Sequence, residues 1–105
     1  MLSGRARRAK GNNYERQKVA ELRELGYQDA VTSRSESRRM DDKGVDILYV
    51  DGYHIQCKRT EAQPNFENVL QGMPDDKFRV VFHKRNNKED TATLLLKDFY
   101  KIMKQ

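Results

Sequence analysis

The sequence has one cysteine, two prolines and no tryptophan in 105 residues. The single cysteine, Cys57, excludes an intramolecular disulfide and any zinc site built from several cysteines. No long apolar run follows the basic N-terminus, so we expect neither a signal peptide nor a membrane anchor. We therefore expect a protein of the reducing cytoplasm with no membrane partner.

The chain is rich in charge, and positive charge dominates. Lysine and arginine number 21 against 16 acidic residues, which gives a net charge of +5 and a pI near 9.4. Such a balance favours a polyanionic partner, most simply nucleic acid. Many small soluble proteins are basic without binding nucleic acid, however, so the charge needs a site to support it.

The length and the periodic apolar clusters predict one domain with a single modest core. We interpret residues 1–10 as a flexible basic arm and residues 11–105 as the domain. A helix is expected to start at Asn12 or Asn13 and to end at Gly26, because the spacing of Val19, Leu22 and Leu25 gives it one apolar face.

The rest of the chain alternates strand and helix patterns. Two strands, 45–50 and 53–60, flank Asp51-Gly52, a dipeptide that favours a tight hairpin turn. The other expected elements are a strand at 29–33, a polar loop at 34–44, a helix at 65–74, strands at 78–83 and 91–96, and a last helix capped by Asp98. The predicted order is α-β-β-β-α-β-β-α.

The predicted hairpin carries polar side chains where a core would be expected. Alternation along the second strand places His54, Gln56 and Lys58 on one face and Ile55 and Cys57 on the other. Asp46 lies across the hairpin, close enough to converge with Gln56 and Lys58. The sequence therefore predicts a compact site of one acid, one amide and one ammonium.

Glu15 is a fourth candidate with two interpretations. Asn12-x-x-Glu15 fits a capping box, in which the glutamate binds the backbone at the helix start. Glu15 also lies four residues before Val19, on the buried stripe of its helix, where a carboxylate needs a partner. The two roles are compatible.

These residues supply oxygen ligands for a divalent cation. The carboxylates of Asp46 and Glu15, the Gln56 side-chain carbonyl and the Cys57 backbone carbonyl form a set that Mg²⁺ or Mn²⁺ prefers. Such a cation polarises a phosphate and lowers the pKa of a bound water, while Lys58 orients the water or stabilises the developing charge. The set predicts phosphodiester hydrolysis.

In these residues the chain resembles the PD-(D/E)xK nuclease superfamily. Asp46, then Gln56-Cys57-Lys58 about ten residues later, and a preceding helix bearing Glu15 are most similar to the small Holliday-junction resolvases of archaea and phages. The resemblance implies a restriction-endonuclease-like α/β fold, with a central mixed sheet flanked by helices. It also implies Mg²⁺-dependent cleavage of branched four-way DNA by a homodimer.

The resemblance assigns catalytic roles to Glu15, Asp46, Gln56 and Lys58. Resolvases usually have glutamate where this chain has Gln56, so Glu15 would have to supply the second carboxylate. Gln56-Cys57-Lys58 with Arg59 is typical of Mrr-like restriction endonucleases. A Mrr-like restriction or repair endonuclease acting on duplex DNA is therefore one alternative function, and a catalytically inactive DNA-binding protein of the same fold is another.

The loop before Asp46 is rich in arginine and serine, the usual partners of phosphate, and the loop could also be merely solvated. We expect DNA contacts from the residues of the arm, of this loop and of two later basic segments. These residues are Arg5, Arg7, Arg8, Lys10, Arg34, Ser35, Ser37, Arg38, Arg39, Lys43, Arg59, Lys84 and Arg85. Cys57 is expected to pack in the core, and His54 and His83 are expected to be structural or solvated.

Overall fold

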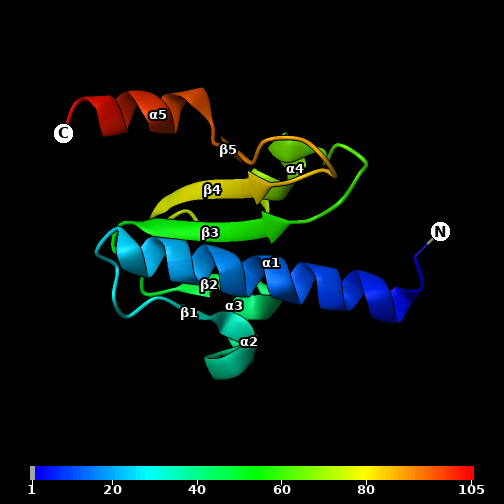
Figure 1. The fold of residues 1–105 in the computed structure, drawn as a ribbon. Helices are drawn as coiled ribbons and strands as arrows, with labels where there is room; N and C mark the ends of the chain where they lie inside the picture. Colours follow the sequence, from blue (N-terminus) through cyan, green and yellow to red (C-terminus); the bar gives the residue numbers. More distant parts are fainter. Residues whose placement is uncertain (1) are drawn as a thin grey trace.

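The computed structural model describes residues 2–105 and is a mixed α/β domain (Figure 1). Its elements in chain order are α1 (Gly4–Glu24), β1 (Val31–Thr32), α2 (Ser33–Glu36), α3 (Arg38–Asp42), β2 (Ile47–Leu48), β3 (Tyr53–Lys58), α4 (Phe66–Gln71), β4 (Phe78–His83), β5 (Thr91–Thr93) and α5 (Leu96–Met103). The mixed sheet, the flanking helices and the order of the main elements confirm the prediction. The two short helices α2 and α3 were not predicted.

The five strands form one sheet in the order β1-β2-β3-β4-β5. All neighbouring strands are antiparallel except β3 and β4, which run parallel along the full length of both strands. The connection between β3 and β4 contains α4, as a parallel pair requires a crossover. The parallel pair therefore ends at a single edge of the sheet, toward the N-terminal half of α1 (Figure 1).

Two apolar clusters cover the two faces of the sheet. On one face Val19 and Leu22 of α1 pack against Ile55 of β3 and Val80 of β4. On the other face Leu70 of α4 packs with Met73 and with Val81, the next residue along β4. Alternate residues of one strand thus face different helices, as strand geometry dictates.

The start of α1 differs from the prediction. The helix begins at Gly4, and the side chain of Ser3 caps it by accepting a hydrogen bond from the Ala6 N–H at 3.1 Å. Residues 1–10 were expected to form a flexible arm, but residues 4–10 are the first turns of the helix, and residue 1 lies outside the described residues. Asn12 and Asn13 lie inside it, because one serine cap and a run of good helix formers outweigh the single glycine at Gly11.

Other boundaries also differ from the prediction. The region expected to be a loop holds α2 and α3, since Ser37 caps α3 by accepting the Met40 N–H. Strands β1, β2 and β5 are shorter than predicted. The last helix begins at Leu96, so Asp98 lies in its first turn instead of capping it.

The hairpin carries an irregularity that shifts its register. The Tyr53 N–H donates to the Val50 carbonyl across Asp51-Gly52, yet Ile47 pairs with Ile55. Two residues of the first strand therefore stand opposite one residue of the second, which defines a β-bulge. Tyr49, at φ 65°, absorbs the extra residue. The bulge brings Asp46 opposite Gln56 in the register.

Among residues 2–105 we find no helix with the length and apolar character needed to cross a bilayer.

Candidate functional site

Asp46 is the centre of the site. It directly precedes β2, and the Cys57 N–H of β3 donates to its carboxylate at 2.8 Å. Burial raises the pKa of Asp46, the Cys57 N–H opposes this, the neighbouring charges of Glu15 and Asp41 add to the rise, and the resulting pKa is about 6. Asp46 is therefore a partly buried acid with two more acids close to it.

Glu15 reaches the same region from α1. The Arg34 Nε–H of α2 donates to the Glu15 Oε1 atom at 2.9 Å, and the two side chains form an ion pair. The Glu15 side chain is 12% exposed. Burial raises the pKa of Glu15, and the ion pair with Arg34 opposes this shift. The capping interpretation is wrong, because Asn12 is inside α1 and the helix starts at Gly4.

Asp41 and Ser33 belong to the site and were not predicted. Ser33 is fully buried; its hydroxyl donates to the Asp41 carboxylate at 3.1 Å and its N–H donates to the Asp46 carbonyl at 2.8 Å. Ser33 thus ties α3 to the start of β2. Ser33 and Asp41 are eight positions apart and lie on two different short helices, α2 and α3, so the sequence could have suggested this pair only if both helices had been predicted.

Lys58 and Gln56 lie on β3 beside these acids. The positive charge of Lys58 is close enough to Asp46 to lower the pKa of its carboxyl group, against the larger effect of burial. Gln56 stands across from Asp46, and a Cβ atom at Gly44 would lie 3.5 Å from its Oε1 atom. The structure therefore brings Glu15, Asp46 and Lys58 together, whereas the Gln56 amide lies against Gly44.

The remaining polar residues of β3 and β4 have structural partners. The Cys57 side chain packs against the core cluster below α1, and burial raises the pKa of its thiol, which keeps it protonated. His54 pairs with Asp76 at 2.8 Å, and the His83 ring bonds the Thr60 carbonyl at 2.9 Å. Both histidines are buried.

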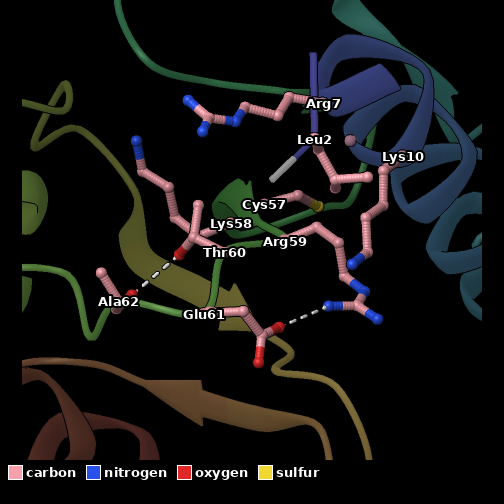
Figure 2. A pocket seen from close by; sticks show the side chains of 10 residues that line it. Leu2, Arg7, Lys10, Cys57, Lys58, Arg59, Thr60, Glu61 and Ala62 are labelled. Atoms are coloured by element: carbon pink, nitrogen blue, oxygen red, sulfur yellow. Dashed lines mark hydrogen bonds and ion pairs between the residues drawn. The ribbon is translucent and has the colours of Figure 1, made fainter. Parts of the chain in front are cut away.

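Part of the predicted DNA-binding set lines a pocket of about 580 Å³ beside Lys58 (Figure 2). The start of α1 and the segment after β3 form its walls. Arg7, Lys10 and Arg59 are the predicted DNA-binding residues in this pocket. Asn86 accepts a hydrogen bond from Lys10 and one from Arg59, each at 2.8 Å, and thereby joins the two walls to the turn between β4 and β5.

Other residues of that set lie outside the pocket. Arg34 binds Glu15, Ser35 donates to the Thr32 carbonyl, and Ser37 caps α3. The Lys84 ammonium donates to the Arg85 carbonyl. Exposed members of the set outside this pocket are Arg5, Arg8, Arg38, Arg39, Lys43 and Arg85.

The residues present fit a hard divalent cation in their donor chemistry. In the part of the chain that the structure describes, no three His, Cys, Asp or Glu side chains form a metal-binding group by themselves. The carboxylates of Glu15 and Asp46 and the Cys57 backbone carbonyl nevertheless offer oxygen donors only, whereas the Gln56 amide lies against Gly44 and would have to turn to join them. The acids crowded around Asp46 also make positive charge favourable there.

Comparison of the chain with protein families, with curated proteins and with solved structures finds no match.

Proposed function

We propose that the chain is a metal-dependent DNA endonuclease that hydrolyses phosphodiester bonds in branched DNA, four-way junctions above all. The convergence of Glu15, Asp46 and Lys58 at one edge of the sheet carries the proposal. The three side chains come from separate parts of the chain: Glu15 from α1, Asp46 from the position before β2, and Lys58 from β3. The restriction-endonuclease-like fold that the sequence suggests is part of the same proposal.

Asp46 supports this function because its contacts within the chain do not compensate for its burial, whereas Glu15 is paired with Arg34. Burying a carboxylate is unfavourable unless it is paired, and Asp46 has a single backbone donor and two acidic neighbours. Sites with such perturbed groups are common in enzymes. The positive Lys58 at the same place adds the charge that an anionic substrate requires.

The proposed chemistry divides the roles among these residues. Asp46, Glu15 and the Cys57 carbonyl would hold Mg²⁺ or Mn²⁺, with Gln56 as a further ligand if its amide turns from Gly44, and the cation would supply positive charge to the phosphate. Lys58 positions the attacking water by hydrogen bonding, or stabilises negative charge on the phosphate. Arg34, which holds Glu15, keeps that carboxylate aimed at the site.

A cleavage assay tests the proposal. Incubation of a labelled four-way junction with the protein and Mg²⁺ should yield paired nicks, and a linear duplex of matched sequence should be cut far more slowly. Asp46→Asn should abolish cleavage and leave junction binding intact. The matched control is Asp51→Asn, since the exposed turn at Asp51 accepts asparagine as readily as aspartate.

The same assay separates the alternatives. Equal cutting of the junction and the duplex contradicts the junction preference, and preferential cutting of methylated duplex favours a Mrr-like enzyme. Gln56, in place of an acid, is the feature that favours an inactive DNA-binding protein. A wild-type chain that binds the junction and leaves it uncut with both Mg²⁺ and Mn²⁺ would establish that alternative.

A further inference from the structure

The pocket beside Lys58 carries a separate inference. It is about 580 Å³ in volume, within the range of roughly 300–1,000 Å³ that small-molecule sites span. One wall is the start of α1 and the other is the chain from Cys57 to Ala62. The pocket is larger than a phosphate group needs. Lys58, which we propose contacts the cleaved phosphate, is one of its lining residues.

The pocket has an excess of positive charge. Arg7, Lys10, Lys58 and Arg59 line it, and Glu61 is its only acid among the described residues. Glu61 is already engaged, because it pairs with Arg59 at 3.4 Å and accepts the Asn86 N–H at 2.7 Å.

Two of the four cations are free to bind a ligand. Lys10 and Arg59 are held by Asn86 at the rim. Within residues 2–105 the side chains of Arg7 and Lys58 have neither an ion pair nor a hydrogen bond, and Figure 2 shows them extending toward the same side of the pocket. Two unpaired cations facing one space favour a phosphate-bearing ligand.

Gly11 opens the wall of this pocket. It lies inside α1, where glycine is less stable than alanine by about 1 kcal/mol. A Cβ atom at Gly11 would meet nothing within 4 Å, so neither crowding nor backbone conformation requires glycine at this position. The missing side chain instead leaves room in the pocket that Gly11 lines.

From these contacts we propose that the pocket binds one nucleotide unit of the DNA strand, the unit next to the cleaved phosphodiester. Arg7 binds the phosphate of that unit, and Gly11 makes space for its sugar and base. Lys58 joins the subsite to the catalytic centre. This inference rests on the proposed nuclease function, because it takes Lys58 as the boundary between the cleaved bond and the flanking nucleotide.

The test is a metal-free titration of the ¹⁵N-labelled protein, followed by amide chemical shifts, with deoxythymidine monophosphate and with a short oligodeoxythymidine. Both ligands should shift amides in residues 7–11 and 57–62. Gly11→Leu should weaken both affinities by at least about tenfold because it fills the space, and Arg7→Gln should do so because it removes a charge-assisted hydrogen bond.

Two control variants separate loss of binding from loss of folding. Ala9→Leu adds the same side chain to an exposed position of the same helix, outside the pocket, and should bind both ligands as wild type does. Gly11→Ala should raise the melting temperature, because alanine is the better helix former, and it should keep most of the affinity.

Several results would overturn the subsite. These are the absence of shifts in residues 7–11 and 57–62, binding of inorganic phosphate as tight as that of the nucleotide, and equal weakening by Gly11→Leu and Ala9→Leu. Binding of the mononucleotide without the oligonucleotide would assign the pocket to a free nucleotide and overturn the strand subsite. Junction cleavage without these shifts would leave the nuclease proposal standing. Nucleotide binding without cleavage would contradict the nuclease proposal, and the pocket would remain a nucleotide-binding site that no longer flanks a cleaved bond.

Discussion

At the scale of single residues, Asp46 shows how a site can oppose the stability of the fold that holds it. Its carboxylate is partly buried, and burial together with the charges of the nearby acids raises its pKa from 3.8 to about 6. The folded state therefore binds a proton at Asp46 more tightly than the unfolded chain does. The free energy of unfolding consequently falls as the pH rises from about 4 to about 6, and it stays lower at neutral pH.

Asp46→Asn should accordingly stabilise the protein in the presence of a chelator. Asparagine keeps the acceptor for the Cys57 N–H and removes the buried charge, so we expect a gain of about 2 kcal/mol at pH 7. Thermal unfolding followed by circular dichroism at several pH values measures it. The gain should vanish near pH 4, where Asp46 of the wild type is protonated, and a gain that is the same at both pH values would contradict burial of the charge as its cause.

Gln56 offers the opposite experiment. Gln56→Glu adds a carboxylate opposite Asp46, so Mg²⁺ and Mn²⁺ should bind more tightly and cleavage should reach its maximum at a lower metal concentration. Calorimetric titration of the metal and the metal dependence of junction cleavage measure these effects. Gln71→Glu, at an exposed position of α4, is the matched control. A metal affinity unchanged by Gln56→Glu would place Gln56 outside the cation site.

The sequence was sufficient to predict that Glu15 is largely buried, and insufficient to predict its partner or the buried Ser33. Helical spacing places Glu15 on the buried stripe of α1, and its side chain is indeed largely buried. Its partner Arg34 and the pair of Ser33 with Asp41 depend on how α2 and α3 pack against the sheet. Such contacts are tertiary, and neither propensity nor periodicity encodes them.

At the scale of elements, the N-terminus of α1 departs most from expectation. Asn12-x-x-Glu15 has the composition of a helix start, but Ser3 provides an earlier cap and the intervening residues include no proline. A capping motif inside a longer helix cannot be distinguished from a true start by local sequence alone. The early start matters because it places Arg7 and Lys10 on the wall of the pocket.

Ser3→Ala tests this helix start. Loss of the hydrogen bond from Ser3 to the Ala6 N–H should destabilise the first turn by about 1 kcal/mol and should speed amide hydrogen exchange there. Exchange in the second half of α1, which packs on the core, should stay unchanged. Exchange at residues 6–10 as fast in the wild type as in the variant would show that the first turns do not persist in solution.

The bulge in the hairpin is another feature that local patterns did not predict. Asp51-Gly52 does mark the turn, but a regular two-residue hairpin would place Asp46 opposite Cys57. Tyr49 at positive φ moves Asp46 by one position, opposite Gln56. Because a one-residue slip exchanges the two faces of a strand, the register of the site depends on this single tyrosine. Tyrosine has no preference for that conformation, so nothing in the sequence signals it.

At the scale of the whole molecule, the candidate site lies at one end of the sheet, an arrangement that the predicted order of elements allowed but did not specify. The parallel pair β3 and β4 ends at one edge, and the N-terminal half of α1 extends over the same end (Figure 1). Lys58 is the last residue of β3 and lines the basic pocket, so the pocket and the acids lie at the same end of the sheet. If the chain is the nuclease that we propose, its DNA strand would cross this end of the sheet, whatever the exact element boundaries.

Two nicks placed symmetrically in a junction require two active sites, so the proposed function also calls for a homodimer. Helix α5 offers a contact surface, because Leu96, Phe99, Tyr100 and Met103 are exposed at helical spacing along one side. We expect wild type to sediment as a dimer and Phe99→Glu to sediment as a monomer that still folds. Lys97→Glu, on the same helix and off the apolar stripe, should remain dimeric.

A wild-type monomer even with junction DNA bound would contradict the dimer, and a dimer that tolerates Phe99→Glu would place the contact on another surface. A monomeric variant that nicks a junction once and releases it would show that pairing of the cuts comes from the dimer.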